Sequence, residues 1–336
     1  GDGDLDLFVG GRIIPGSYPK APLSYLLEND GKGFFKVVTS SVAPDLQRIG
    51  MVSDAKWADL NGDGKQDIIV VGEWMGIKVF INEDGKLINK SDEFLDNAYQ
   101  GWWNTIEVND LDGDGDMDFI VGNLGMNNQM KASRESPVSM QYADYDDNGS
   151  VDPILFYHIQ GKSFPYASRD ELIAQLPMLK KRFVDYESYS SAVLETIFTE
   201  KEQALSKELV ATTFETSVFI NNANEQFAKM SLPIEAQFSP VYSIAVLDVN
   251  GDDILDIILG GNLEKTRVRT GKYTGNNGFV FIGNISGTYH YLNQNNSGLN
   301  VSGDVRKIII DGDRILFGRN NSDVMIYEIK GDIEIL

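Results

Sequence analysis

Aspartate residues recur at alternate positions of a short loop in this sequence. The segment DLDGDGDMD places Asp110, Asp112, Asp114 and Asp118 at positions 1, 3, 5 and 9, and an apolar run follows directly. Alternate residues of a tight loop can turn their carboxylates inward, and position 7 can offer its backbone carbonyl. Ca²⁺ takes six to eight such oxygens at about 2.3–2.6 Å, whereas Mg²⁺ requires a stricter octahedron. The spacing therefore predicts a calcium site.

The same loop recurs three more times in full, and the chain opens inside a fifth copy, which predicts four to five calcium sites. The other predicted side-chain ligands are Asp59, Asn61, Asp63, Asp67, Asp144, Asp146, Asn148, Asp152, Asp248, Asn250, Asp252, Asp256, Asp2 and Asp6. The predicted backbone-carbonyl ligands at position 7 are Asp4, Lys65, Asp116, Ser150 and Ile254. A single Asp/Asn/Gly cluster could be a polar turn, but copies in fixed register favour calcium. Position 12 carries no Glu, so these loops are not EF-hands.

Each loop leads into a short apolar run that ends in glycine, such as QDIIVVG and MDFIVG. Apolar runs of four to eight residues bounded by turn residues are typical of buried strands. Repeating units of roughly 50 residues with about four strands match the blades of a β-propeller. We therefore expect an all-β protein, a β-propeller of about six blades that forms a single domain over residues 1–336.

The spacing of the loops becomes irregular between the loop at 110 and the loop at 248. Only 34 residues separate Asp118 from Asp152, whereas 104 separate Asp152 from Asp256. Residues 168–210 are predicted to form a helical insertion, because Ser168 with Glu171 and Thr199 with Glu202 have capping-box spacing. These helices either fill a gap beside a short blade or provide a docking surface.

Composition excludes several classes of protein. The net charge of −21 makes the chain a poor nucleic-acid binder, since the phosphate contribution would be repulsive. Cysteine is absent, so there is no disulfide framework and no thiolate site. No apolar stretch approaches the roughly 18 residues of a membrane span. The hydrophobic content of 42% is ample for a packed core.

Two further groups of residues are candidates for partner binding. Trp102 and Trp103 either stack on a sugar or partner, or fill the space between blades. Arg267, Arg269, Lys272 and Tyr273 belong to the most basic stretch of an acidic chain and form either an anion site or a solvated loop. No catalytic constellation is identifiable, and the sequence contains no G-x-S-x-G elbow and no P-loop.

The loop followed by an apolar strand and glycine resembles FG-GAP, or VCBS, repeats, which are the calcium-binding blades also found in integrin α-subunit heads. The segments GDGDLDLFVGGRIIPGSYP, GWWNTIEVNDLDGDGDMDFIVGNLGMN, FPYASRDELIAQLPMLKKRF and LPIEAQFSPVYSIAVLDVNGDDILDIILGGN are similar to the C-terminal part of large VCBS-repeat proteins that also carry an ASPIC/UnbV domain. The resemblance implies an exported or outer-membrane-attached protein of a Gram-negative bacterium, with further blades upstream.

We therefore expect a non-catalytic, calcium-binding scaffold for binding or adhesion at the bacterial cell surface. Its partner would be another surface protein or an anionic glycan. One alternative is a subunit of an outer-membrane uptake or assembly complex, docked through the helical insertion. The other is a calcium-dependent polysaccharide lyase, for which Lys272 and Tyr273 are the candidate catalytic groups.

Overall fold

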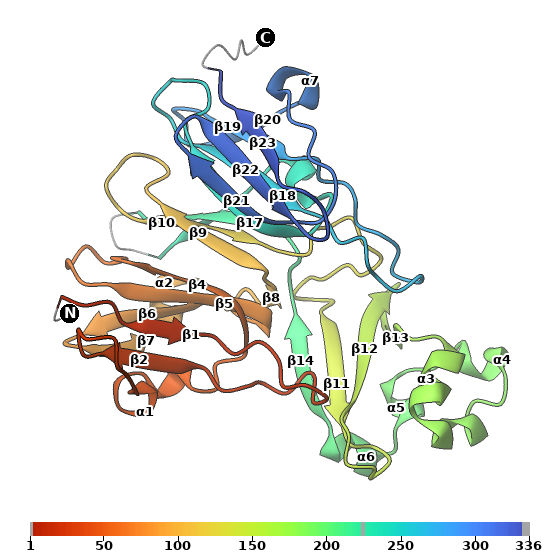
Figure 1. Ribbon diagram of the computed structural model, residues 1–336. Coiled ribbons are helices and arrows are strands. Elements are labelled where there is room, and N and C mark those ends of the chain that lie inside the picture. The colour runs from red at the N-terminus through yellow and green to blue at the C-terminus, as the bar shows by residue number, and fades with distance from the viewer. Residues whose placement is uncertain (1–2, 223–225, 331–336) are drawn as a thin grey trace.

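The computed structural model describes residues 3–222 and 226–330, and they form an all-β protein with 38% strand and 14% helix. The described residues form six antiparallel sheets, five of which follow a predicted loop (Figure 1). After the loops at 59, 110, 144 and 248, the apolar run that follows position 9 becomes an inner strand of its sheet. After the partial loop at the start of the chain it becomes an edge strand, in which Leu7 and Val9 are exposed. The prediction of an all-β repeat architecture is confirmed.

The sheets are numbered in the order in which they begin along the chain. Sheet 1 consists of β1 (Leu7–Val9), β2 (Tyr25–Asn29) and β3 (Phe35–Val37). Sheet 2 consists of β4 (Met51–Ala58), β5 (Asp67–Met75), β6 (Lys78–Glu83), β7 (Lys86–Asn89) and the short β8 (Gly101–Trp102), which pairs with β5. Sheet 3 consists of β9 (Thr105–Asn109), β10 (Asp118–Gly122), β15 (Ser217–Ile220) and β16 (Ala228–Ser231).

The remaining sheets follow the same antiparallel pattern. Sheet 4 consists of β11 (Val138–Ala143), β12 (Asp152–Ile159), β13 (Lys162–Pro165) and β14 (Lys207–Ala211). Sheet 5 consists of β17 (Val241–Leu247), β18 (Asp256–Gly261), β19 (Phe279–Gly283) and β20 (Tyr289–Leu292). Sheet 6 consists of β21 (Val305–Asp311), β22 (Arg314–Arg319) and β23 (Met325–Glu328).

Sheets 1, 2, 3, 5 and 6 pack face to face in that order. In β5, Ile68 and Val70 join the core shared with sheet 1, whereas Ile69 and Val71 join the core shared with sheet 3. This alternation is the period-2 consequence of a strand covered on both sides. The same division of neighbouring residues between two cores recurs in β10 and β18.

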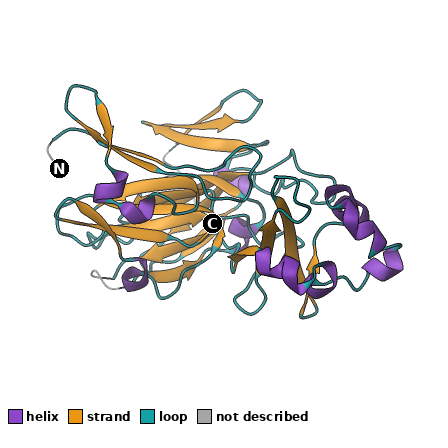
Figure 2. Ribbon diagram, turned by 90° about the horizontal axis from the view of Figure 1, so that it is seen from below, coloured by secondary structure: helices purple, strands orange, loops and turns teal. Residues whose placement is uncertain are grey.

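The packed sheets do not close into a ring among the described residues. Within residues 3–222 and 226–330, no strand of sheet 1 pairs with a strand of sheet 6. The expected β-propeller is therefore confirmed only as a series of repeated, stacked sheets. The view from below shows the stacked strands on one side and a group of helices at the opposite end (Figure 2).

Sheet 4 is nested inside sheet 3, which explains the irregular spacing of the loops. The chain leaves sheet 3 after β10, builds sheet 4, and returns as β15, which pairs with β10 through Phe119 opposite Phe219. The segment directly after β10 lies beside the segment directly before β15. The Asn123 N–H donates to Thr216 Oγ1 at 3.1 Å, and the Gly125 N–H donates to the Phe214 carbonyl at 2.8 Å. The unit that follows Asp118 is therefore interrupted and not short.

The helices of the described residues are all short, and half of them lie within the predicted insertion at 168–210. That insertion contains α3 (Arg169–Gln175), the 3₁₀ helix η2 (Pro177–Lys181), α4 (Tyr186–Tyr189), α5 (Leu194–Ile197) and α6 (Glu200–Leu205), and its last residues belong to β14. Elsewhere lie α1 (Thr39–Val42), η1 (Pro44–Leu46), α2 (Ser91–Phe94), η3 (Ile234–Gln237) and α7 (Gln294–Ser297). Both predicted capping boxes, at Ser168 and Thr199, are formed.

The helical insertion covers one face of sheet 4. Leu172, Leu179 and Phe198 of the insertion share a buried core with Ile154 and Phe156 of β12. The helices therefore have a packing role, whatever else they do. In the described part of the chain, every helix is too short or too polar to cross a membrane.

Candidate metal-binding loops and the basic segment

The first aspartate of each complete loop organises the turn through its own backbone. In the 110 loop, Asp110 Oδ1 accepts from the N–H groups of Gly113 at 2.8 Å and Asp114 at 3.1 Å, and Oδ2 accepts from Gly115 at 3.0 Å. Equivalent bonds to Oδ1 and Oδ2 form at Asp59, Asp144 and Asp248. Gly115, at position 6, has a φ of +97°, a left-handed conformation that favours glycine. The loop conformation is thus encoded locally.

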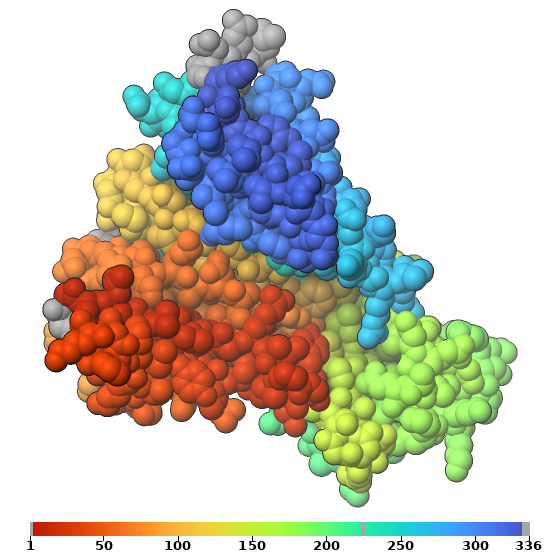
Figure 3. Space-filling view, in the orientation of Figure 1, coloured from red at the N-terminus to blue at the C-terminus, as the bar shows by residue number. Residues whose placement is uncertain are grey.

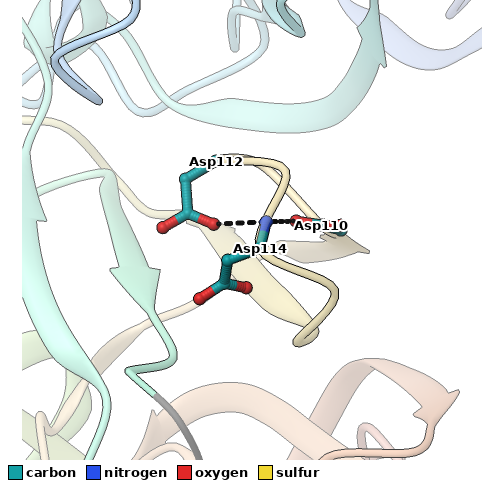
Figure 4. A group of neighbouring side chains, drawn as sticks. All are labelled: Asp110, Asp112 and Asp114. Atoms are coloured by element: carbon teal, nitrogen blue, oxygen red, sulfur yellow. Dashed lines mark hydrogen bonds between the residues drawn. The ribbon is translucent and has the colours of Figure 1, made fainter.

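Three carboxylates of the 110 loop converge on one another. Ligand oxygens of Asp110, Asp112 and Asp114 all lie within 4.8 Å of each other, and Figure 4 shows the carboxylates of Asp112 and Asp114 side by side. Asp112 Oδ1 and Asp114 Oδ1 each accept one backbone N–H, at 3.3 and 2.9 Å. In the 144 loop, the carboxylates of Asp144, Asp146 and Asp152 converge within the same limit.

The loops at 59 and 248 have the same backbone hydrogen bonds but an asparagine at position 3. The amide of Asn250 donates to Asp252 Oδ2 at 2.9 Å, and Asn61 Oδ1 accepts from the Asp63 N–H at 3.1 Å. At position 7 of the 59 loop, the Lys65 ammonium lies 3.4 Å from the Asp63 carboxylate. The backbone N–H of Lys65 and then its ammonium lower the pKa of Asp63. Each of these two loops therefore has three carboxylates at ligand positions, as the 144 loop does, whereas the 110 loop has four.

The aspartate at position 9 connects the loop to the rest of its sheet. Asp118 Oδ2 accepts from the Leu111 N–H at 2.8 Å, and Oδ1 accepts from the Asn221 N–H at 2.7 Å, just beyond β15. Asp67 makes the same pair of bonds to Leu60 and Asn82, and Asp256 makes them to Val249 and Gly283. The buried apolar residue at position 2 of each complete loop was not predicted, although Leu60, Leu111, Tyr145 and Val249 at that position were a visible signal.

Burial changes the acidity of the position-9 aspartates. Asp67, Asp118 and Asp256 are fully buried, and Asp152 is nearly so. Loss of solvation raises the pKa of Asp118 to about 7 and that of Asp256 to about 6, although two backbone N–H donors to each oppose the shift. The remaining acidic side chains of each loop add to the increase. A nearby cation would favour the charged form and reverse this effect.

The donor atoms of these loops fit a hard divalent cation. They are carboxylate and amide oxygens held at short range by a preformed turn, and the position-7 carbonyls can add to them. Without a cation, the converging carboxylates repel one another. The partial loop at the start of the chain is incomplete: Asp2 lies outside the described residues, Asp4 is half-buried, and Asp6 is exposed, with its Oδ1 accepting from the Asn29 N–H at 3.0 Å.

The structure places the two tryptophans differently. Trp103 is 1% exposed, its indole N–H donates to the Tyr99 carbonyl at 2.9 Å, and it lies in the core between sheets 2 and 3. Trp102 is half-buried and meets Trp74 edge-on, with ring centroids 4.9 Å apart. Trp103 is thus placed to pack between sheets and has almost no surface to offer a partner.

The basic residues of the 262–278 segment also divide into two groups. Arg267 and Lys272 are exposed, whereas Tyr273 is 8% exposed and packs beside Trp74 and Trp102. Arg269 lies over the ring of Tyr166 at 4.9 Å and forms an ion pair with Glu171 of the helical insertion at 3.4 Å. The structure therefore joins the basic segment to the helical insertion but turns Tyr273 away from solvent.

These loops and stacked sheets define a class of repeat protein in which each unit couples an oxygen-rich loop to a buried strand. Residues 1–70 and 59–121 match the model of the FG-GAP-like repeat, which supports an FG-GAP repeat protein. The match ends before the loops at 144 and 248, which nevertheless have the same spacing and hydrogen bonds.

Comparison with curated proteins gives no match. Among solved structures, the V. cholerae biofilm matrix protein Bap1 is 9% identical, with 92% of this chain and 66% of that chain covered and a TM-score of 0.29. BBS1N in complex with ARL6DN, soaked with lead, is also 9% identical, with 98% and 80% covered and a TM-score of 0.31. This chain thus spans just under two thirds of Bap1, and both scores are too low to show a shared fold.

Proposed function

We propose that this protein is a calcium-binding, non-catalytic scaffold for binding or adhesion at the surface of a Gram-negative bacterium. The observation that carries the proposal is the recurrence of one oxygen-donor loop, with the same backbone hydrogen bonds, at 59, 110, 144 and 248. Repeated loops of this kind suit structural cations, because each one fixes the start of a buried strand. Extracellular calcium at roughly 10⁻³ M would fill sites of extracellular affinity.

The binding role is supported by the parts of the molecule that do not repeat. The helical insertion and the basic segment each occur once, and they contact each other through Arg269 and Glu171. Figure 3 shows the light-blue part of the chain reaching down to the green helical part. Features that break a repeat are the natural carriers of specificity on a repeated scaffold.

The enzymatic alternative receives no support from Tyr273, one of its two candidate residues. A lyase of this kind needs an accessible base, but burial raises the pKa of Tyr273 to about 12. The proposal therefore assigns Tyr273 a packing role. No contact in the described residues favours the alternative of an outer-membrane assembly subunit over that of a binding scaffold.

The proposal is tested by co-sedimentation of the purified chain with Gram-negative outer-membrane vesicles. We expect the chain to sediment with the vesicles at roughly millimolar calcium, the range of extracellular sites, to be released by a chelator, and to return when calcium is restored. The Asp114→Ala variant should need more calcium for the same binding. Equal sedimentation with and without calcium, or none in either case, would overturn the proposal.

A further inference from the structure

A cavity of about 610 Å³ opens where sheet 4, the helical insertion and the basic segment meet. Its walls come from β12 and β13, from the residues around α3 and α4, and from Arg269. The volume lies in the range of small-molecule sites, about 300–1,000 Å³. None of these three parts belongs to the repeated scaffold of sheets 1, 2, 3, 5 and 6.

The charged side chains that line this cavity are all cations. Lys162, Arg169 and Arg269 line it, and no aspartate or glutamate does, although the chain has fifty acidic residues and a net charge of −21. The walls also carry aromatic rings, including those of Tyr157, Tyr186 and Tyr189. Aromatic rings and a few charged groups around one cavity are suited to a ligand that has both flat apolar faces and acidic groups.

The three cations are not equally available to a ligand. Arg169 is committed, because its guanidinium donates to the carbonyls of Phe183 and Val184 and pairs with Asp170 at 2.7 Å. Lys162 is exposed, and within the described residues no carboxylate lies in ion-pair range of its ammonium. Arg269 pairs with Glu171 at 3.4 Å in a solvent-accessible ion pair, which is a weak interaction that a ligand carboxylate can replace.

The rings are held in place by neighbours at the rim of the cavity. The Tyr186 hydroxyl donates to Asp170 at 2.9 Å, and the Tyr189 hydroxyl donates to the Ala167 carbonyl at 2.7 Å. Arg269 is held over Tyr166, which in turn meets Tyr157 edge-on at 5.6 Å. A fixed set of rings loses little conformational entropy when a ligand stacks on it.

We propose that this cavity binds an acidic saccharide, with Lys162 and Arg269 pairing with its carboxylate and the tyrosine rings contacting its sugar faces. The inference rests on the proposed binding function and names the ligand class for it. A sugar acid meets the chemistry of the cavity better than a neutral sugar, because it satisfies the cation of Lys162 as well as the rings. A cavity lined by cations is unusual in a chain with a net charge of −21, and an anionic ligand would account for it.

The test uses the full chain at fixed calcium and a trisaccharide of galacturonic acid, with its fully methyl-esterified form as the neutral control of equal size. Isothermal titration should show binding of the acidic form, weakened about tenfold or more in the neutral form and in Lys162→Ala, since a charge-assisted contact is lost. Arg269→Ala should show a similar loss. Lys86→Ala is the matched control, because Lys86 is an exposed lysine of sheet 2 outside the cavity, and it should bind as the wild type does.

Several outcomes would overturn the inference. They are equal affinity for the acidic and esterified forms, wild-type affinity in Lys162→Ala, an equal loss in Lys86→Ala, or no binding of the acidic trisaccharide. Vesicle binding that survives periodate but not protease would identify a protein partner and would also refute it. If calcium-dependent vesicle binding persists in Lys162→Ala and Arg269→Ala, the cavity inference alone fails. If the wild-type protein shows no calcium-dependent vesicle binding, the proposed scaffold function fails.

Discussion

At the scale of single residues, the loops separate ligand positions from neighbouring acidic positions. Asp114 lies at position 5, where its carboxylate converges with those of Asp110 and Asp112. Asp116 lies two residues later, at position 7, where the backbone carbonyl and not the side chain faces the predicted ion. Replacing either aspartate by alanine removes one negative charge, but only the replacement of Asp114 removes a predicted ligand group.

The first prediction compares Asp114→Ala with Asp116→Ala. We expect Asp114→Ala to weaken calcium binding at this loop by about tenfold or more, because affinity follows the number of charged ligands. Asp116→Ala should bind almost as the wild type does. Calcium titration followed by the melting temperature measures the difference. Equal losses in the two variants would show that net charge, and not a ligand position, controls the site.

The second prediction concerns pH and the position-9 aspartates. Burial raises the pKa of Asp118 to about 7 and that of Asp256 to about 6, above the ordinary value for aspartate. Between those values and about 4, the folded metal-free protein binds more protons than the unfolded chain, so its free energy of unfolding rises as the pH falls. The added stability is complete below the unfolded pKa and is lost as the pH rises through the folded pKa.

Calcium should reverse this pH dependence, because the ion requires ionised carboxylates. Melting curves of dialysed, metal-free protein and of calcium-loaded protein between about pH 7.5 and pH 5 provide the measurement. The gap between their melting temperatures should narrow as the pH falls, and Asp118→Asn should flatten the slope of the metal-free series. A metal-free melting temperature that decreases as the pH falls over this range would contradict the prediction.

At the scale of elements, the position-9 aspartate joins three parts of one sheet. Asp118 begins β10, accepts from the loop at Leu111, and accepts from Asn221 beyond β15. Because Asn221 follows a 94-residue excursion through sheet 4, this single carboxylate helps to hold the interrupted sheet together. Asp6 makes the equivalent bond to Asn29 but is exposed to solvent.

The third prediction follows from that difference in burial. Asp118→Ala should lower the free energy of unfolding by about 2–4 kcal/mol even without calcium, because it leaves two buried N–H donors unpaired. Asp6→Ala should cost under about 1 kcal/mol, since water can replace the exposed carboxylate. Urea unfolding in a chelator measures both. Similar losses in the two variants would show that the hydrogen bonds to Asp118 do not stabilise sheet 3.

The elements that could be predicted from the sequence are those encoded by local patterns. Loop spacing located the inner strands, and capping boxes at Ser168 and Thr199 located two helix starts. The nesting of sheet 4 within sheet 3 could not be predicted, because the pairing of Phe119 with Phe219 joins residues that are far apart in sequence. The cavity beside Lys162 could not be predicted either, since it forms only where three separate segments meet.

At the scale of the whole molecule, the outward face of sheet 1 is apolar and is not covered by another sheet in the described residues. In the inner strands of sheets 2, 3 and 5, the first and third residues after the position-9 aspartate face the preceding sheet of the stack. These residues are completely buried; they are Ile68, Val70, Phe119, Val121, Ile257 and Leu259. In sheet 1 the equivalent residues are Leu7 and Val9, which are 46% and 42% exposed. Strand register adds Leu27, Val37, Tyr25 and Phe35 to the same face.

The last prediction is that this outward face of sheet 1 makes the isolated chain self-associate. Contiguous apolar surfaces of this kind normally mark an interface, and β3 is an exposed edge strand that can pair with another chain. Sedimentation velocity should show concentration-dependent association that decreases in the double variant Phe35→Ser and Val37→Thr. Ile285→Ser is the control, because Ile285 is 96% exposed on a loop of sheet 5 and removes a similar apolar group elsewhere. A monodisperse wild-type monomer at all concentrations, or an equal decrease in the control, would show that the face does not drive association.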